Sequence, residues 1–302
     1  MAQVSILGAG AWGKALQKLA LVNGHTVKLW TRNAPTLPEI VGNCDLLVSA
    51  LPMSAVREVA QMMHTLSIEP QVVFLSTTKG LDVQSGLTPC QIWQTYLPHQ
   101  SLAVMSGPNL SQEIMAGLPS ATVVASRDLA SAELVQTIFA SHYFRVYTNP
   151  DPIGVELGGT LKNVIAIAVG ACDGLKLGDN AKAALITRSL AEIIRIASHW
   201  GAKPETFWGL SGLGDLLATC NSPLSRNYRL GLALAQGQTL AQAIASIGST
   251  IEGINTTKAL IQIADREHIY LPVCRYVYQL LEGQITPTQA LAGLMARDLK
   301  PE

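Results

Sequence analysis

A glycine pattern near the amino terminus restricts the fold of this chain more than any other feature of its sequence. Gly8-Ala9-Gly10-Ala11-Trp12-Gly13 directly follows the β-forming run Val4–Leu7 and opens a segment with helical apolar spacing. Glycines in this context permit a tight turn and let the backbone approach a pyrophosphate, which would lie against the helix N-terminal amides. The alternative is a turn needed only to pack the strand on the helix. We expect a dinucleotide site that includes Gly8, Gly10, Ala11 and Gly13.

The two halves of the chain differ in the period of their apolar residues. The first half alternates short β-branched runs with helical segments, as in βαβ units of a parallel sheet. The expected strands are Val4–Leu7, Thr26–Trp30, Asp45–Ala50, Val72–Ser76, Leu102–Met105 and Ala121–Val124. From Asp151 onward the period is helical, with one stripe formed by Ile186, Leu190, Ile193, Ile194 and Ala197.

Two prolines in Asn149-Pro150-Asp151-Pro152 interrupt both patterns and mark a hinge. The sequence therefore predicts an α/β protein with a Rossmann-type domain over residues 1–150. An all-α substrate-binding domain is expected over residues 151–302.

Charge and hydropathy favour a small-molecule partner. Lys+Arg and Asp+Glu balance at 21 each, which provides no basic field for nucleic acid and no polybasic patch for an anionic membrane. The longest apolar stretches, such as residues 164–172, reach about half the roughly 20 residues of a membrane span. The first residues enter a strand pattern without the basic and apolar regions of a signal peptide. We expect a cytoplasmic protein without membrane insertion.

Cysteine and histidine spacing gives no sign of a metal site. The five cysteines are widely separated, form no C-x-x-C pair and are odd in number, and the histidines lack the spacing of metal ligands. A chain of 302 residues can bury full cores without such cross-links. The sequence predicts buried thiols, no disulfide framework and no metal.

A basic residue stands where the cofactor's ribose is expected. The second strand ends at Trp30-Thr31-Arg32, and an NAD-selective protein would normally place Asp or Glu there. Arg32 could accommodate a 2'-phosphate, so we expect NADP or NAD as cofactor, with NADPH slightly favoured; a solvated arginine is the alternative. The dozen residues between Arg32 and Asp45 are too few for the helix and third strand of a full half-Rossmann unit. The adenine side is expected to be abbreviated.

Lys162 and Asn163 interrupt a segment, residues 152–171, that is apolar nearly all round and of helical length. A helix of this kind is buried, and an ammonium in a protein interior is costly unless it is paired or faces a polar cleft. Desolvation can tune such a lysine for acid-base work. Lys162 is the candidate proton donor to a carbonyl oxygen, and the alternative is a lysine whose head reaches the surface.

Three further polar groups are weaker candidates when each is taken alone. Ser225-Arg226-Asn227 precedes an apolar segment, so Ser225 is a plausible N-cap and the helix start suits a phosphate, although an ordinary surface helix fits as well. Lys79 follows a strand, at the sheet edge where α/β proteins bind ligands. Asp215 lies in the expected glycine-rich turn 212–216, where Asp often bonds only local backbone.

Together these motifs resemble the NAD(P)-dependent glycerol-3-phosphate dehydrogenase family. The similar segments follow one another in order: Gly8–Gly13, Thr78–Gly80, Ser106–Pro108, Leu161–Val164, Gly212–Leu216 with Thr219-Cys220, Ser225–Asn227 and Ile251–Gly253. The resemblance implies reversible reduction of dihydroxyacetone phosphate to sn-glycerol 3-phosphate, a precursor of glycerophospholipids. It also suggests a homodimer.

The resemblance implies a role for each matching residue. Lys162 is the general acid and base, and Lys79 touches both substrate and nicotinamide. The expected substrate residues are Lys79, Gly107, Asn109, Lys162, Asp215, Thr219, Ser225, Arg226 and Asn227. Arg226 is also expected near the cofactor, which Trp12, Ser111 and Glu252 border.

The chain departs from the family pattern in three places. Asn109 stands where the family usually has serine, so one substrate contact changes from hydroxyl to amide. Ser111 replaces the usual alanine near the cofactor. The compressed stretch 33–43 lacks the family's longer insert with its third strand, which affects the adenine pocket and leaves the two lysines in place.

Two other functions fit part of the sequence. A related two-domain dehydrogenase could act on a carboxylate, since arginine also binds carboxylates through two hydrogen bonds. A regulator that senses NAD(P)H without turnover finds support only in the shortened Rossmann half. The retention of Lys79, Lys162 and Asp215 favours turnover.

Overall fold

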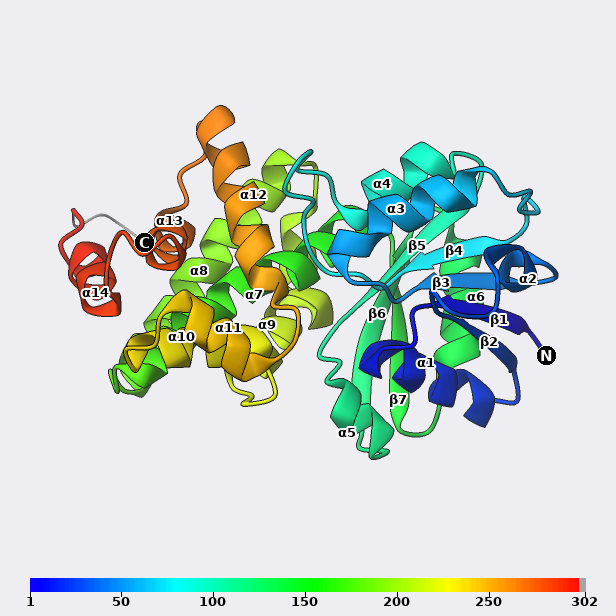
Figure 1. The fold of residues 1–302 in the computed structure, drawn as a ribbon, viewed down its shortest axis with the longest axis horizontal. Coiled ribbons are helices and arrows are strands. Elements are labelled where there is room, and N and C mark those ends of the chain that lie inside the picture. The colour runs from blue at the N-terminus through cyan, green and yellow to red at the C-terminus, as the bar shows by residue number, and fades with distance from the viewer. Residues whose placement is uncertain (299–302) are drawn as a thin grey trace.

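The computed structural model describes residues 1–298, which form a sheet covered by helices on both faces and, beside it, a cluster of helices (Figure 1). The strands are β1 (Gln3–Leu7), β2 (Thr26–Trp30), β3 (Leu46–Ser49), β4 (Val73–Ser76), β5 (Ser101–Ser106), β6 (Ser120–Ser126) and β7 (Phe144–Asn149). The helices between them are α1 (Ala11–Val22), α2 (Leu37–Val41), α3 (Met53–His64), α4 (Pro89–Tyr96), α5 (Ser111–Met115) and α6 (Leu129–Phe139).

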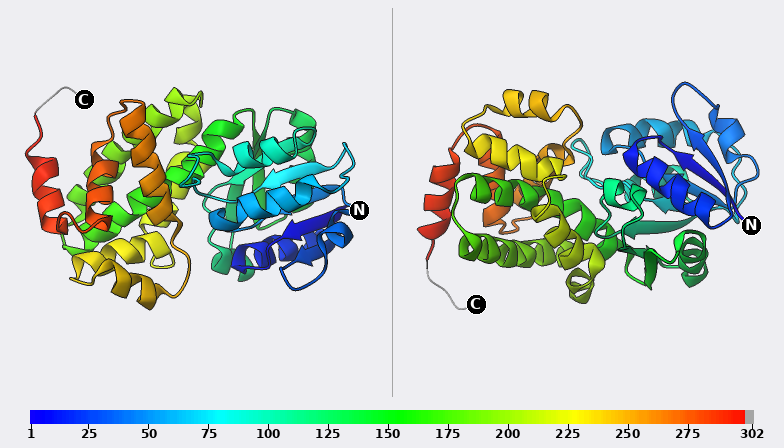
Figure 2. Two further views of the ribbon diagram at one scale, coloured as in Figure 1. Left: turned by 45° about the horizontal axis from the view of Figure 1, so that its top comes forward. Right: turned by 90° about the horizontal axis from the view of Figure 1, so that it is seen from below.

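The second half of the described chain contains helices only. They are α7 (Pro152–Gly174), α8 (Asp179–His199), η1 (Pro204–Trp208), η2 (Leu210–Gly214), α9 (Asp215–Cys220), α10 (Arg226–Ala235), α11 (Leu240–Ile247), α12 (Glu252–Arg266), α13 (Pro272–Leu281) and α14 (Pro287–Met295). Figure 2 shows the two halves side by side in both further views. The predicted fold class, an α/β Rossmann-type unit followed by helices, is confirmed.

The seven strands lie in the order β2-β1-β3-β4-β5-β6-β7. Pairs from β2 to β5 are parallel, as predicted, but β6 runs antiparallel to β5, so the expectation of a wholly parallel sheet is wrong there. The connection 107–119 contains only the five-residue α5 and not the long crossover helix that usually joins parallel strands. Sequence reasoning also missed β7, a half-exposed edge strand parallel to β6.

The abbreviation expected after the second strand is present. The strand β2 forms one edge of the sheet, and no further strand lies outside it among residues 1–298. The segment before Asp45 forms only the five-residue α2, which begins at a capping box of Thr36 and Glu39, so it is too short for a helix and a further strand, as predicted. The adenine side of the sheet thus keeps one short helix and loses a strand.

Alternating strand residues build two cores. Ile6 and Val48 pack on α1 and α6 at one face, while Leu7 and Leu47 pack on α3 and α4 at the other. Both faces are buried because successive side chains of a strand point to opposite sides. This double cover leaves the carboxyl ends of β1, β3 and β4 as the place where loops can form a site.

The helix α7 is the centre of the helical unit. By length and composition it could cross a membrane, but 94% of its most apolar window is buried inside the protein, as in a core helix. It crosses α10 at very short range. The crossing requires glycine at position 231, because a Cβ there would lie 1.9 Å from the Ile167 carbonyl oxygen. Its first residue, Pro152, follows the N-cap Asp151, whose side chain accepts a hydrogen bond from the Gly154 amide. The long helix thereby starts at the predicted hinge.

Candidate active site

The glycine turn after β1 has the shape needed for a nucleotide. Gly8 has a φ of +110°, and a Cβ there would lie 2.7 Å from the Ala50 carbonyl oxygen, whereas one on Gly13 would lie 1.9 Å from that of Gly8. Gly10, by contrast, has open space within 4 Å of a Cβ and starts α1 without a side-chain cap. The first amides of α1 thus remain available to phosphate oxygens, so the turn fits a dinucleotide.

A cavity of about 280 Å³ adjoins this turn. It is lined by Gly8, Ala9, Trp30, Thr31, Arg32, Leu51, Pro52, Ser54, Ala55 and Val59. Arg32 is the one charged residue among these, and its Nη2 atom lies 3.0 Å from Glu58 Oε2. The structure therefore places Arg32 at the expected nucleotide pocket, and it adds a carboxylate partner that the sequence reasoning did not anticipate.

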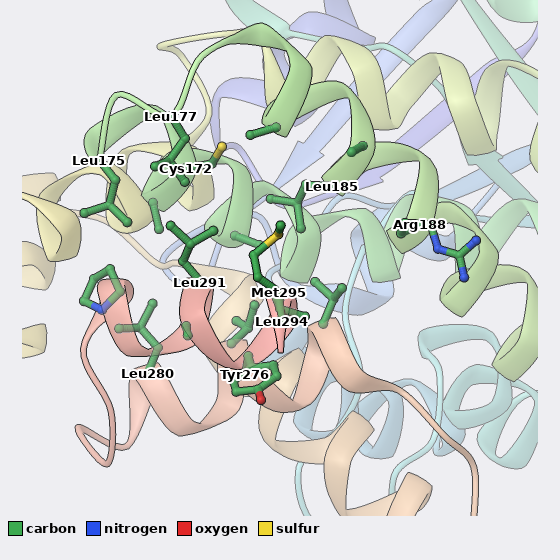
Figure 3. A pocket seen from close by; sticks show the side chains of 18 of the residues that line it. Cys172, Leu175, Leu177, Leu185, Arg188, Tyr276, Leu280, Leu291, Leu294 and Met295 are labelled. Atoms are coloured by element: carbon green, nitrogen blue, oxygen red, sulfur yellow. The ribbon is translucent and has the colours of Figure 1, made fainter. Parts of the chain in front are cut away.

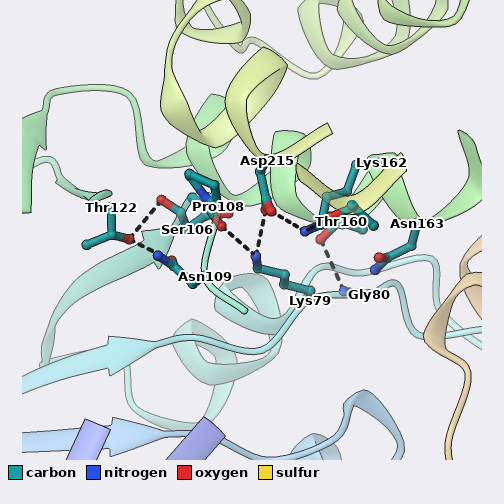
Figure 4. A network of polar contacts seen from close by, with 12 residues as sticks. Lys79, Gly80, Ser106, Pro108, Asn109, Thr122, Thr160, Lys162, Asn163 and Asp215 are labelled. Atoms are coloured by element: carbon teal, nitrogen blue, oxygen red, sulfur yellow. Dashed lines mark hydrogen bonds and ion pairs between the residues drawn. The ribbon is translucent and has the colours of Figure 1, made fainter. Parts of the chain in front are cut away.

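Lys79, Asp215 and Lys162 form a charged network between the sheet and the helical unit (Figure 4). Lys79 Nζ donates a hydrogen bond of 2.6 Å to Asp215 Oδ2 and one of 3.4 Å to the Gly107 carbonyl oxygen. Lys162 Nζ donates to Asp215 Oδ1 and, at 2.7 Å, to Thr219 Oγ1. Three elements distant in sequence, the loop after β4, α7 and α9, therefore bring the two predicted catalytic lysines onto one carboxylate.

Burial sets the chemistry of this network. The side chains of Asp215, Lys162 and Lys79 are 1%, 9% and 25% exposed. Desolvation lowers the pKa of Lys162 to about 7, although the Asp215 carboxylate opposes this shift. An amine with this pKa can both donate and accept a proton near neutral pH. The alternative of a lysine that reaches bulk water is excluded.

Glycines inside helices make the close approach possible. A Cβ on Gly158 would lie 2.5 Å from the Ser211 carbonyl oxygen, and one on Gly159 would lie 2.1 Å from Ser106 Oγ and 3.2 Å from Lys79 Cε. The expected turn at residues 212–216 is wrong, since η2 leads directly into α9. Gly212 lies against the backbone of Phe207, since a Cβ on Gly212 would be 2.2 Å from the Phe207 carbonyl oxygen. This glycine therefore permits close packing and does not form a turn.

Glu252 joins the helical unit to the nucleotide half. Its Oε1 atom accepts a hydrogen bond of 3.3 Å from the Met53 amide at the start of α3, and its other oxygen faces Gly80, beside Lys79. Burial raises the pKa of Glu252, and the positive charge of Arg226 partly offsets this. The structure thus places this predicted cofactor residue next to the loop that bears Lys79.

The motif 225–227 divides into an outer and an inner part. Ser225 caps α10 through a hydrogen bond accepted from the Tyr228 amide, as predicted, and Arg226 is exposed at the first position of the helix. Asn227 is buried: its amide donates 2.9 Å to Asn163 Oδ1, and its oxygen accepts from the Gly253 amide. Asn227 therefore ties the lysine-bearing helix α7 to α12.

Three further predicted residues lie at β6, α5 and α1. Asn109 is engaged with β6, donating to the Ala121 carbonyl oxygen and accepting from Thr122 Oγ1. Ser111 begins α5, and Trp12 is half-buried on the sheet side of α1. Asn109 thus shows a structural tie where the sequence predicts a substrate contact.

Sequence reasoning missed several residues that shape the site. Thr160 Oγ1 accepts a hydrogen bond of 3.1 Å from the Gly80 amide, which fixes the Lys79 loop on α7. Glu156, also on α7, accepts one of 2.8 Å from the Cys90 amide in the first turn of α4. The sequence carried no motif for these two hydrogen bonds; the pair Gly158-Gly159 indicated only that other parts of the chain approach α7 closely, since glycines inside a helix are costly.

A second cavity lies away from this network, between α7, α8, α13 and α14 (Figure 3). Its volume is about 250 Å³, and apolar side chains such as Leu185, Val277 and Leu291 line it. Cys172 at its edge is ten residues beyond Lys162 on α7, which corresponds to about 15 Å along a helix. None of the predicted site residues borders this cavity.

A glycine turn that fits a dinucleotide, together with a buried lysine of lowered pKa in a charged network between the sheet and the helices, is the arrangement of a two-domain NAD(P)-dependent dehydrogenase. Family models narrow this class. The model described as NAD-dependent glycerol-3-phosphate dehydrogenase C-terminus matches residues 151–292, and the N-terminus model matches residues 3–43 and 34–132. The chain belongs to the NAD(P)-dependent glycerol-3-phosphate dehydrogenase family, as the resemblance predicted.

Relatives and solved structures agree with this assignment. A protein of Nostoc sp. (strain PCC 7120 / SAG 25.82 / UTEX 2576), named glycerol-3-phosphate dehydrogenase NAD(P)+, is 57% identical over 99% of this chain and 98% of its own. The crystal structure of glycerol-3-phosphate dehydrogenase from Coxiella burnetii is 36% identical, with a TM-score of 0.92 over 98% of this chain and 99% of its own. A PanE/ApbA family ketopantoate reductase from Ralstonia eutropha JMP134, 15% identical with a TM-score of 0.56 over 96% and 99%, shares the fold alone.

Proposed function

We propose that this chain catalyses the reversible NAD(P)H-dependent reduction of dihydroxyacetone phosphate to sn-glycerol 3-phosphate. The observation that carries the proposal is the contact of Lys79 and Lys162 with the single carboxylate of Asp215, at the carboxyl edge of the sheet. This network has a net positive charge, which suits a phosphorylated substrate. The name of the relatives, together with their full-length coverage, supports the same substrate.

Lys162 is the proposed general acid and base. In the reduction its ammonium donates a proton to the carbonyl oxygen, and in the oxidation its neutral amine removes the proton from the hydroxyl. The reduced nicotinamide, when bound, supplies the hydride to the carbonyl carbon. Asp215 and Thr219 hold the amine in place, and Lys79 contributes a second positive charge beside Gly107.

The other predicted residues have positioning roles in this proposal. Gly8, Gly10, Ala11, Trp12, Gly13, Ser111 and Glu252 would hold the dinucleotide, and Arg32 would favour NADPH over NADH. Gly107, Asn109, Ser225, Arg226 and Asn227 would surround the substrate. In the proposed division of labour residues 1–150 bind the dinucleotide and residues 151–302 bind the substrate; residues 299–302 lie outside the described part of the chain.

We also propose a cytoplasmic homodimer that supplies glycerophospholipid synthesis. Its stoichiometry can be measured by sedimentation, where a monomer at micromolar concentration would contradict the dimer. The relatives' names describe the reaction and leave this stoichiometry to experiment.

An absorbance assay at the nicotinamide band tests the reaction. Dihydroxyacetone phosphate is supplied with NADH or NADPH separately, and either cofactor should be consumed. A carboxylate ketone is the matched comparison, because several fold neighbours such as the ketopantoate reductase act on acids by name. Turnover of the carboxylate ketone but not of the phosphate would reject the proposed substrate. Cofactor binding without any turnover would favour the sensing regulator.

A further inference from the structure

We propose that Glu58 is a specificity residue of the nucleotide site. By holding Arg32, its carboxylate lowers the affinity of the pocket for a 2'-phosphate and so permits the use of NAD as well as NADP. This inference rests on the proposed function, because it concerns the dinucleotide of that reaction. It assigns a role to a residue that does not itself line the pocket.

The geometry places Glu58 on α3 beside the residues that line the pocket. Ser54 and Ala55 of α3 line the cavity. Glu58 is one helical turn beyond Ser54 and therefore lies on the same face of α3. From there its Oε2 atom reaches Arg32 Nη2 at 3.0 Å, across from the end of β2. The guanidinium at the pocket is thus already engaged by a carboxylate of the same protein.

The charge of Glu58 should weaken the binding of a 2'-phosphate. A 2'-phosphate must compete with Glu58 for Arg32, and the like charges of carboxylate and phosphate also repel each other. A ribose 2'-hydroxyl carries no charge and meets neither cost. Among the residues that line the cavity only Arg32 is charged, so Glu58 acts on the one lining cation that can select NADP.

The pair has little value for stability. The side chains of Arg32 and Glu58 are 69% and 60% exposed, and an ion pair in such a position contributes little to folding. The adjacent core of α3, with Val56 and Val59, packs without it. Replacement of Glu58 should therefore leave the fold intact and change only nucleotide selection.

Binding of nucleotide fragments tests the proposal without turnover. The affinities of wild type and Glu58→Gln for adenosine 2',5'-bisphosphate and for 5'-AMP are measured by calorimetry. We expect the variant to bind the bisphosphate about fivefold more tightly, since an exposed ion pair and one nearby like charge are each weak, and to bind 5'-AMP within about twofold of wild type. Glu133→Gln, an exposed change of equal charge on α6, is the matched control and should change neither affinity.

Two further measurements decide whether Glu58 acts through Arg32. In an Arg32→Gln background the effect of Glu58→Gln should disappear, and at about 1 M salt it should shrink because exposed charges are screened. An equal change for both nucleotides, or an effect that persists without Arg32, would overturn the proposal. If the wild type binds neither nucleotide, the nucleotide site itself is wrong, which is a failure of the proposed function and not of Glu58 alone.

Discussion

Two of the places where carboxylates meet cations, the network around Asp215 and the pair of Arg32 and Glu58, differ in burial. At the chemical site Asp215 is 1% exposed and contacts two lysines, whereas at the nucleotide pocket Glu58 is 60% exposed and contacts one arginine. In the interior a lost partner leaves an uncompensated charge, while at the surface water replaces it. The first site therefore tolerates little change, and the second can be adjusted without loss of the fold.

The sharpest test of the buried site is removal of its proton carrier. In Lys162→Ala the reduction should slow about 100- to 10,000-fold, because general acid catalysis contributes a factor of this size. The turn at Gly8–Gly13 is untouched, so nucleotide affinity should stay near the wild-type value. Turnover is measured by absorbance at the nicotinamide band and affinity by calorimetry.

A second lysine serves as the control for this variant. Lys258 on α12 pairs with Glu282 at the surface, and Lys258→Ala removes the same charge without touching the network. It should keep nearly full activity. Near-normal turnover of Lys162→Ala would show that Lys162 is not the proton donor. The buried network around Asp215 would then have no catalytic role that distinguishes it from the exposed pair of Arg32 and Glu58.

Loss of the shared carboxylate should affect stability as well as rate. Asp215→Asn removes the counter-charge that the two lysine amines share, and breaking a buried pair typically costs about 3–5 kcal/mol. Because the carboxylate raises the pKa of Lys162, its removal should move that pKa further below 7. Urea unfolding measures the first effect, and the pH dependence of kcat/KM measures the second.

The exposed pair of Arg275 and Asp265 provides the comparison for this variant. Asp265→Asn should change the free energy of unfolding by less than about 1 kcal/mol, as expected for a surface ion pair. If Asp215→Asn were equally mild, the distinction between the buried and exposed carboxylates would be wrong.

The pH dependence of the wild-type rate should be opposite for the reduction and for the oxidation, because each needs a different protonation state of the Lys162 amine. Reduction needs the ammonium, so its kcat/KM should fall up to about tenfold per pH unit above a midpoint near 7. Oxidation needs the neutral amine, and its rate should fall as pH drops below the same midpoint. Parallel profiles in both directions would contradict proton transfer by Lys162.

Much of this comparison was accessible from the sequence, because it depends on local patterns. The glycine turn, the strands and a buried Lys162 follow from spacing and from the apolar segment around it. The partnership of Lys79 with Asp215 did not follow, since these residues are 136 positions apart and meet only when α7 packs on the sheet. The antiparallel β6 was hidden for the same reason, because strand direction depends on how the chain returns.

The pair of Arg32 and Glu58 shows a further limit of sequence reasoning. A basic residue after β2 was visible, but its partner on α3 is 26 positions away and carries no motif. An exposed ion pair is also weak, and it does not alter the pattern of apolar residues that sequence reasoning depends on. Exposed contacts of this kind are visible only in the folded structure. A buried contact is indicated in the sequence by a polar residue within an apolar run, as with Lys162.

The smallest expected effect on folding belongs to this exposed pair. Arg32→Gln should change the free energy of unfolding by less than about 1 kcal/mol, because Arg32 and Glu58 are exposed and water solvates Glu58 when the ion pair is lost. It should still weaken NADPH about tenfold, since a charge-assisted hydrogen bond to the 2'-phosphate contributes roughly 1.5–3 kcal/mol, and leave NADH within about twofold. Thermal unfolding and fluorescence titration with each nucleotide measure the two quantities. Equal weakening of both nucleotides would mean that Arg32 supports the pocket generally, and the surface site would then resemble the buried one.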